Sequence, residues 1–285
     1  MPLPERLPDL AEDARRVAQV ALAEDGSRDL TTEVVSSSAE TVQGRLECRG
    51  RAVLAGLAYA DAVGRLAGVS LTWSAREGQR IEGDVIGEVS GGLGAVLRAE
   101  RPLLNLLQRA SGIATATRAY VDALAGTTCR LLHTRKTAAG LRLFDVAAVV
   151  AGGGEVHRLD LARTVMIKDN HWRALERSGR SLADALEDAR RRGALACLVE
   201  VESEPMVRAA CSAGADRLLI DNQTPDTVRA WARLARSLAP RTEIEASGGV
   251  TLATARAYAD AGADYVSVGA ITNSVDSADI ALELF

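Results

Sequence analysis

Two lysines and three histidines fall within one short stretch of this chain, and their side chains can bind anions. The chain has 34 basic residues, of which Lys136 and Lys168 are the two lysines and the rest are arginines. A lysine offers a compact ammonium on a flexible stem, which the planar guanidinium of arginine cannot imitate. His133, His157 and His171 lie in the same part of the sequence. The stretch from 133 to 171 is therefore a candidate anion-binding site.

Polar or glycine residues follow each of six short apolar runs in the second half of the chain. The runs read as β-strands, and the carboxyl ends of the strands of an α/β barrel share one mouth. The residues at those ends are, in chain order, Arg135, Lys136, Lys168, Asp169, Glu200, Glu202, Asp221, Ser247, Gly248, Gly249, Gly269 and Ala270. Cations come first, carboxylates next and glycine turns last. This order predicts a ligand with an anionic head, hydroxyl groups in its middle and a phosphate tail.

The glycine turns are the candidate phosphate site. Ser247, Gly248 and Gly249 precede a helix start at Thr251, and backbone N–H groups at a helix N-terminus bind phosphate well. Barrels of this type frequently hold phosphate after their last strands. Glycine also ends strands for steric reasons alone, so this motif indicates a phosphate site by its position more than by its composition.

A cluster of cations near the first two strand ends could hold a planar dicarboxylate. Arg135, Lys136, His157, Arg158 and Lys168 belong to three consecutive segments, and each charge-assisted hydrogen bond contributes about 1.5 to 3 kcal/mol. For any single arginine of this arginine-rich chain, a solvated surface position is the simpler interpretation. The two lysines end apolar runs, so a functional position is favoured for them. Of the three histidines, His157 is the one that we expect to be functional, and the other two are interpreted as structural.

Carboxylates at the middle strand ends can serve a sugar phosphate in several ways. Glu200 and Glu202 alternate onto one face of their predicted strand, and a packed barrel interior does not easily bury two uncompensated carboxylates. At least one of them should face the mouth. There it and Asp221 could bind ribose hydroxyls, hold Mg²⁺ carried by pyrophosphate, or stabilise positive charge on a sugar carbon.

The elements that must position these residues divide the chain into two parts. In the second part, apolar runs alternate with helical stretches such as Ser181–Arg192, which is the pattern of βα units around a parallel sheet. Six such runs favour a barrel or part-barrel over a doubly wound sheet. The first part starts with a helix at Pro8–Glu24 and continues with short β segments, so it reads as a small α+β domain. A helical segment from Ala95 to Ala125, expected to be broken or kinked near Pro102 and Gly112, connects the two parts.

Composition and charge exclude several classes of protein. The chain has 285 residues, 47% of them hydrophobic, and a formal net charge of -4. With acids and bases interspersed, it has no single-sign field for nucleic acid or an anionic membrane, and no apolar run of the roughly 20 residues that span a bilayer. The four cysteines lack the spacing of a zinc site. We place the protein in the cytoplasm, where these thiols would stay reduced.

Short motifs along the whole chain carry a family resemblance. The second half contains TRKT (134–137), GGG followed by HR (152–158), IKDNH (167–171), EVE (200–202), IDN (220–222), SGG (247–249) and VGA (268–270). The first half contains EDGSRDLTT (24–32) and ERPLLNLLQRASGIAT (100–115). In their order and approximate spacing these motifs resemble the quinolinate phosphoribosyltransferase family. Any one of the tripeptides is weak, but seven motifs in this order are highly specific.

The resemblance implies an α/β fold with an open α/β barrel (TIM-barrel-like) and an N-terminal α/β sandwich domain. The N-terminal domain would cover residues 1–115 and the barrel residues 116–270, with a C-terminal segment, 271–285, returning to the N-terminal domain. A homodimer or higher homo-oligomer with shared active sites is also implied. The implied reaction joins quinolinate to phosphoribosyl pyrophosphate with Mg²⁺, giving nicotinate mononucleotide, pyrophosphate and carbon dioxide, a step of NAD biosynthesis.

The resemblance also implies roles for individual residues. Quinolinate would be bound by Arg135, His157, Arg158 and Lys168, joined by Arg101 from the neighbouring subunit. Phosphoribosyl pyrophosphate would be served by a catalytic group of Lys136, Glu200 and Asp221, and the two carboxylates would meet Mg²⁺ indirectly, through pyrophosphate. The 5′-phosphate would lie at Ser247, Gly248, Gly249, Gly269 and Ala270.

Four residues depart from the usual family pattern. Val156 replaces an asparagine, Asp160 a glycine, Ala139 a proline and Asn273 a histidine. An extra carboxylate near the predicted dicarboxylate pocket keeps two alternatives open. One is a divergent paralogue that transfers phosphoribosyl to another aromatic carboxylate, and the other is a non-catalytic barrel that binds a phosphosugar. The retained lysines and carboxylates favour an enzyme.

Overall fold

The computed structural model describes residues 6–35 and 40–285, so the start of the first predicted domain and residues 36–39 lie outside it. Internal contacts group the chain into two compact units. The barrel unit comprises residues 119–135 and 154–269, and the sandwich unit comprises residues 7–118, 136–153 and 270–285. The domain bounds expected from the sequence stay a prediction.

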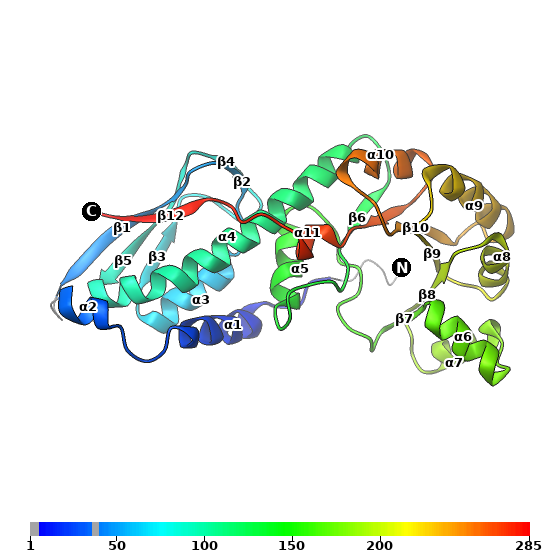
Figure 1. The fold of residues 1–285 in the computed structure, drawn as a ribbon, viewed down its shortest axis with the longest axis horizontal. Helices are drawn as coiled ribbons and strands as arrows, with labels where there is room; N and C mark the ends of the chain where they lie inside the picture. The colour runs from blue at the N-terminus through cyan, green and yellow to red at the C-terminus, as the bar shows by residue number, and fades with distance from the viewer. Residues whose placement is uncertain (1–5, 36–39) are drawn as a thin grey trace. The chain divides into compact units, whose positions relative to one another are not determined.

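A six-stranded parallel sheet forms the barrel unit, in the strand order β6-β11-β10-β9-β8-β7. Its helices α8, α9 and α10 lie along the outside of the strands (Figure 1). The strands are β6 (Arg130–Leu132), β7 (Thr164–Ile167), β8 (Ala196–Val201), β9 (Arg217–Asp221), β10 (Glu243–Ser247) and β11 (Tyr265–Ser267). The helices are α6 (Asp169–Ser178), α7 (Leu182–Arg191), α8 (Glu204–Ser212), α9 (Pro225–Leu238) and α10 (Leu252–Asp260). The sheet is open, because β6 and β7 are its two end strands.

Burial and capping explain why these segments form strands and helices. All six residues of β8 are buried, as are the first four of β9, and such continuous apolar runs are typical of parallel sheets covered on both faces. Two helices begin at capping hydroxyls: Ser181 accepts a hydrogen bond from the Asp184 N–H, and Thr224 accepts one from Thr227. The prediction of an α/β fold with a barrel-type parallel sheet is confirmed.

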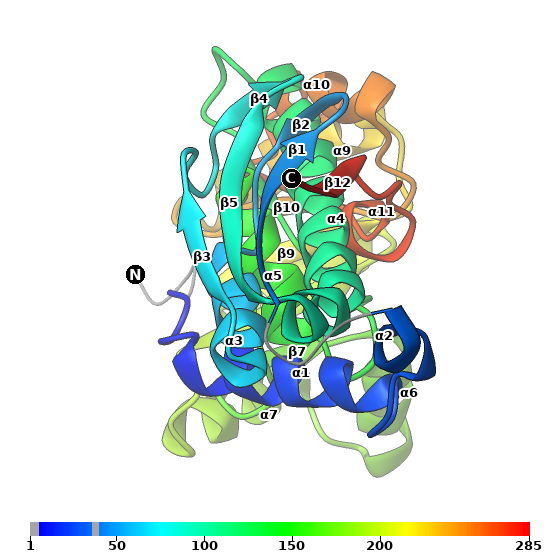
Figure 2. The same cartoon turned by 90° about the vertical axis from the view of Figure 1, so that its left-hand side faces the viewer.

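The sandwich unit is built on a four-stranded antiparallel sheet in the order β12-β1-β5-β3, with β2 and β4 paired separately. Figure 2 shows β3, β5 and β1 running side by side. Its strands are β1 (Thr41–Cys48), β2 (Arg51–Val53), β3 (Ser70–Trp73), β4 (Arg80–Glu82), β5 (Val85–Gly92) and β12 (Ile280–Leu284). Its helices are α1 (Ala11–Glu24), α2 (Leu30–Val35), α3 (Leu57–Ala67), α4 (Leu93–Ala123, whose last residues belong to the barrel unit), α5 (Arg142–Ala151) and α11 (Ala270–Asn273). The last strand, β12, pairs with the first, β1, from Gly44 opposite Leu284 to Cys48 opposite Ile280.

α4 is one helix of 31 residues, whereas the sequence led us to expect a break or kink near Pro102 and Gly112. A proline inside a helix removes one backbone hydrogen bond, which costs about 3 kcal/mol. Pro102 is buried together with Leu103, Leu104 and other apolar residues of the helix, and burial of this face offsets the missing bond. The expectation of a break is therefore wrong.

In the described part of the chain, no helix combines the length and apolar character needed to cross a bilayer.

Candidate active site

Lys168 and Glu200 form an ion pair at the carboxyl ends of two neighbouring strands. β7 and β8 pair with Ile167 opposite Val199, so the residues that follow lie beside each other. The Lys168 ammonium donates to the Glu200 carboxylate; the lysine side chain is 44% exposed and the glutamate side chain 6%. The Trp172 indole N–H donates to the Glu200 carbonyl at 2.9 Å. The strand ends therefore present an exposed cation above a buried carboxylate.

His157 lies deeper, against a carboxylate that the sequence analysis did not identify. Its Nε2 is 3.2 Å from Oε1 of Glu245, and both side chains are almost fully buried. Arg217, which is also buried, donates from Nη1 to Oε2 of Glu245 at 3.1 Å. Burial alone would raise the pKa of Glu245, but His157, Arg217 and a hydrogen bond from Ser267 lower this pKa to about 2. Glu245 is therefore ionised at neutral pH, between two basic side chains.

Alternation along β10 is the signal that could have found Glu245. Glu243, Glu245 and Ser247 are spaced two residues apart, so they project from one face of the strand. A barrel interior does not easily bury an uncompensated carboxylate, and this holds for β10 as it does for the strand that carries Glu200 and Glu202. The compensating Arg217 comes from β9, opposite Glu243 in the sheet register, and sequence alone does not reveal that pairing.

Two more arginines of the predicted cluster also lie in the barrel unit. Arg158 donates to the Thr164 carbonyl at 3.3 Å and to Met166 Sδ at 3.2 Å, so its guanidinium lies beside β7. Arg135 follows β6, and among the described residues its buried Nε has no hydrogen-bond partner. A buried donor left unpaired costs about 1 to 3 kcal/mol, and a bound carboxylate would satisfy it.

The glycine turn after β10 interlocks with the end of β9. Gly248 and Gly249 have φ angles of 75° and 63°, a region that glycine adopts without strain. A Cβ on Gly248 would lie 2.3 Å from Oδ1 of Asn222, whose backbone N–H donates to the Ser247 carbonyl at 2.8 Å. Asp221 is opposite Ser247 in the register. The structure thus brings this carboxylate and the candidate phosphate turn together.

Lys136, Ala270 and Arg101 belong to the sandwich unit, and Gly269 is the last residue of the barrel unit. Arg101 lies on α4 with a 59% exposed side chain, beside a cavity of about 310 Å³ that Arg16 also lines. An exposed guanidinium is what a residue contributed to another subunit's site requires.

The loop that carries Lys136 is held by a closed ring of hydrogen bonds within the sandwich unit. The Thr272 hydroxyl donates to the Lys136 carbonyl at 2.8 Å, and the Ala138 N–H donates to Asp145 at 2.9 Å. Arg109 donates twice to the fully buried Asp145, at 3.0 and 2.9 Å, and once to the Thr272 carbonyl at 3.0 Å. The backbone of this loop is therefore fixed before a ligand binds.

The departures near His157 are accommodated locally. Oδ1 of the exposed Asp160 accepts a hydrogen bond from the Ala162 N–H at 2.8 Å, so this carboxylate caps its own turn. Val156 is 3% exposed and packs in the core.

The residues that the structure describes contain no group of three or more His, Cys, Asp or Glu side chains arranged to hold a metal ion. Glu200 is engaged by Lys168, and Asp221 accepts a hydrogen bond from the Asn222 amide at 2.6 Å. Mg²⁺ is usually held by one or two carboxylates together with waters and substrate phosphates, and not by a cage made of protein alone. Two carboxylates on neighbouring strands suit a metal that arrives on pyrophosphate.

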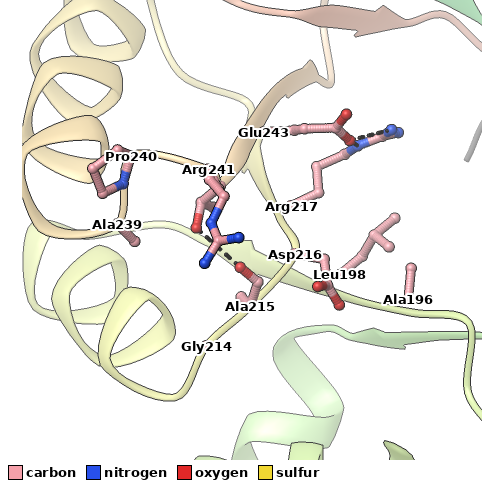
Figure 3. Close-up of a pocket in the computed structure, with 11 residues that line it drawn as sticks. Ala196, Leu198, Gly214, Ala215, Asp216, Arg217, Ala239, Pro240, Arg241 and Glu243 are labelled. Atoms are coloured by element: carbon pink, nitrogen blue, oxygen red, sulfur yellow. Dashed lines mark hydrogen bonds and ion pairs between the residues drawn. The ribbon is translucent and has the colours of Figure 1, made fainter. Parts of the chain in front are cut away.

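A cavity of about 460 Å³ lies at the opposite, amino ends of the same strands (Figure 3). Residues at or just before the starts of β8, β9 and β10 line it, among them Ala196, Arg217 and Glu243. Figure 3 shows the ion pair between Arg217 and Glu243. Ligands of α/β barrels bind at the carboxyl ends, so this cavity is not the predicted active site.

Comparison with known proteins covers both halves of the chain. The family model "Quinolinate phosphoribosyl transferase, N-terminal domain" matches residues 29–111, and "Quinolinate phosphoribosyl transferase, C-terminal domain" matches residues 113–283. A Mycobacterium leprae protein named nicotinate-nucleotide pyrophosphorylase [carboxylating] is 37% identical over 279 residues, which are 95% of this chain and 97% of that protein. The human protein of the same name is 35% identical, covering 87% of this chain and 84% of its own length.

Solved structures agree with these sequence matches. The nicotinate-nucleotide pyrophosphorylase from Francisella tularensis superposes with a TM-score of 0.90 at 29% identity, over 99% of each chain. NadC from Streptococcus pyogenes superposes with a TM-score of 0.88 at 33% identity, over 98% of this chain and 99% of the other. The similarity to these proteins thus extends over both units of the fold.

Proposed function

This chain belongs to the quinolinate phosphoribosyltransferase family, and we propose that it transfers phosphoribosyl from phosphoribosyl pyrophosphate to quinolinate with decarboxylation. The products are nicotinate mononucleotide, pyrophosphate and carbon dioxide. The reaction is a step of NAD biosynthesis.

The observation that carries this proposal is the order of chemical groups across the parallel sheet. From β7 to β10 the strands are neighbours in chain order, so Lys168, Glu200, Asp221 and the turn at Ser247 follow one another in space. The cation matches the carboxylates of quinolinate, and the two protein carboxylates match the sugar of phosphoribosyl pyrophosphate. The glycine turn matches the 5′-phosphate.

Binding of the acceptor is assigned to the cations of the first strands. Arg135, His157, Arg158 and Lys168 would hold the two carboxylates of quinolinate, and Arg101 of a neighbouring subunit would join them. The unpaired Nε of Arg135 and the exposed ammonium of Lys168 support this assignment. Asp160 accepts a hydrogen bond from the Ala162 N–H of its own turn, which supports quinolinate as the acceptor.

In the proposed reaction the pyridine nitrogen attacks C1 of the sugar, and the bond to pyrophosphate breaks with its electron pair on the leaving oxygen. Positive charge develops on the sugar, where Glu200 and Asp221 stabilise it electrostatically. Lys136, on its fixed loop, neutralises negative charge on phosphoribosyl pyrophosphate. The product ring nitrogen is cationic, so the ring accepts the electron pair left when the adjacent carboxylate departs as carbon dioxide, and a proton takes its place.

Glu200 and Asp221 would interact with Mg²⁺ indirectly, because the ion would be bound to pyrophosphate. The ion would offset the negative charge of the leaving group. Ser247, Gly248, Gly249, Gly269 and Ala270 would surround the 5′-phosphate, with the positive φ angles of Gly248 and Gly249 supporting a close approach of backbone N–H groups.

A homodimer or higher homo-oligomer with shared sites and a cytoplasmic location complete the proposal. The exposure of Arg101 is consistent with a side chain that serves another subunit. The four free cysteines are those expected in a reducing compartment. Light scattering of the purified protein tests the oligomer, and a monomer at working concentration would contradict it.

The function is tested by incubating the protein with phosphoribosyl pyrophosphate, Mg²⁺ and quinolinate and detecting nicotinate mononucleotide by mass spectrometry. Lys168→Ala should raise the KM for quinolinate about tenfold to a hundredfold, the loss expected for one charge-assisted hydrogen bond of about 1.5 to 3 kcal/mol. The matched control is Arg177→Ala, an exposed cation in the last turn of α6, which should leave the KM unchanged. Absence of product, or equal effects of the two substitutions, would contradict the proposal.

A further inference from the structure

Glu245 lies between two fixed partners inside the barrel unit. Its Oε2 accepts from Arg217 Nη1 at 3.1 Å, and its Oε1 is 3.2 Å from His157 Nε2. Arg217 is held in turn by two hydrogen bonds to Glu243, at 3.0 and 2.7 Å, and its guanidinium carbon lies 3.8 Å from the centre of the Tyr265 ring. Oε2 of Glu245 is therefore held by Arg217, whereas Oε1, which has no hydrogen-bond partner among the described residues, faces the His157 ring at ion-pair distance.

Glu245 is the most deeply buried carboxylate of this group, and His157 is one of the two basic side chains that lie against it. Arg217 and Glu245 are each 1% exposed, whereas Glu243 is 22% exposed. A net negative charge is costly to bury. The imidazole Nε2 of His157, 3.2 Å from Oε1 of Glu245, therefore lies where it faces the inner carboxylate from the side opposite Arg217.

We propose that Glu245, clamped by Arg217, is a positioning residue for His157: it engages the Nε2 proton and so leaves Nδ1 as the ring nitrogen that meets a substrate carboxylate. This inference rests on the proposed function, because it presumes that His157 binds the dicarboxylate. A structural role alone does not require these groups, since apolar side chains of similar volume fill a barrel interior at least as well.

The test compares Glu245→Gln with Glu243→Gln. Both substitutions remove a carboxylate from the same strand and from the same arginine, but only Glu245 contacts His157. Glu245→Gln should raise the KM for quinolinate about tenfold or more, while kcat and the KM for phosphoribosyl pyrophosphate change less than about threefold. Glu243→Gln should leave the KM for quinolinate within about threefold of the wild type. Equal effects of the two variants on that KM, or no effect of either, would overturn the proposal.

Nitrogen NMR of isotope-labelled histidine gives a readout that does not depend on catalysis. The chain has only three histidines, and the signal of His157 can be assigned by its loss in His157→Asn. The wild type should show a protonated Nε2 at this residue, and Glu245→Gln should change that signal while Glu243→Gln does not. An unprotonated Nε2 in the wild type, or an unchanged signal in Glu245→Gln, would overturn the positioning role even if nicotinate mononucleotide forms. The expected spectra without product formation would instead locate the failure in the proposed function.

Discussion

At the scale of single residues, the buried carboxylates of the described residues lie against basic side chains from other parts of the chain. Asp145 is fully buried and takes two hydrogen bonds from Arg109, and Arg217 is buried between Glu243 and Glu245. Removing one partner of such a pair leaves the other charge uncompensated, which costs about 3 to 5 kcal/mol. These pairs also fix candidate site residues: Asp145 holds the loop of Lys136, and Glu245 lies against His157.

The lowered pKa of Glu245 predicts how its contribution to stability depends on pH. This pKa falls from 4.5 to about 2 on folding, so the stabilisation is fully present above about pH 4.5 and is lost as the pH falls through about 2. The difference in free energy of unfolding between wild type and Glu245→Gln should be about 3 kcal/mol near neutral pH and should shrink between about pH 4.5 and pH 2. Urea titrations of both proteins at each pH measure it. A difference that does not change over this range would contradict the prediction.

At the scale of elements, glycine on α4 has a packing role that helix propensity alone does not suggest. The sequence led us to expect the helix to be broken or kinked near Gly112. In the structure the helix continues through it, and a Cβ at this position would lie 2.1 Å from the backbone oxygen of Asp276. The N–H of Ala278, two residues further on, donates to the Gln108 carbonyl. Gly112 is therefore required where the C-terminal segment crosses α4.

Replacing Gly112 by alanine should destabilise the protein, because the backbone oxygen of Asp276 has to move. We expect Gly112→Ala to lower the free energy of unfolding by about 1 to 3 kcal/mol or more, as overpacked sites do. Gly94→Ala on the same helix is the control, since its Cβ would meet only the Thr32 side chain, at 3.3 Å. That variant should stay within about 1 kcal/mol of the wild type, because alanine also favours helix. Thermal and urea unfolding compare the two, and equal losses would rule out the close-approach argument.

At the scale of the whole molecule, the candidate site residues are distributed over both units of the chain. The chain passes between the units several times, so Lys136 and Ala270 belong to the sandwich unit although they follow barrel strands. Both units also bury their thiols: Cys48 lies in the sandwich unit, and Cys129, Cys197 and Cys211 lie in the barrel unit.

Burial of all four thiols predicts that the folded protein resists thiol reagents. Burial raises the pKa of every one of them, and that of Cys129 to about 12, so little thiolate forms near neutral pH. A colorimetric disulfide reagent at about pH 8 should label none of them within minutes in the native state and all four after denaturation. Fast labelling of even one thiol in the native protein would show that its unit opens readily.

Much of the fold and of the candidate site could be predicted from the sequence, because those features depend on local patterns. Continuous apolar runs such as β8 and capping residues such as Ser181 mark strands and helices wherever they occur. Since the ends of parallel strands meet at one edge, the same runs also predicted that Lys168 and Glu200 would share one mouth, and in the structure the two side chains form an ion pair. The motif order indicated the family in the same way.

Only the tertiary structure decided which distant residues compensate one another. The pairing of Glu245 with His157 and Arg217, and the contact between Gly112 and Asp276, join positions that are far apart in the chain. Burial sets the free-energy cost of an unpaired charge or of a steric clash at these positions. A pattern of single residues in the sequence does not show which positions are buried together. The sequence by itself thus indicated which chemical groups belong to the candidate site, and the packing of the strands decided which partner each buried group has.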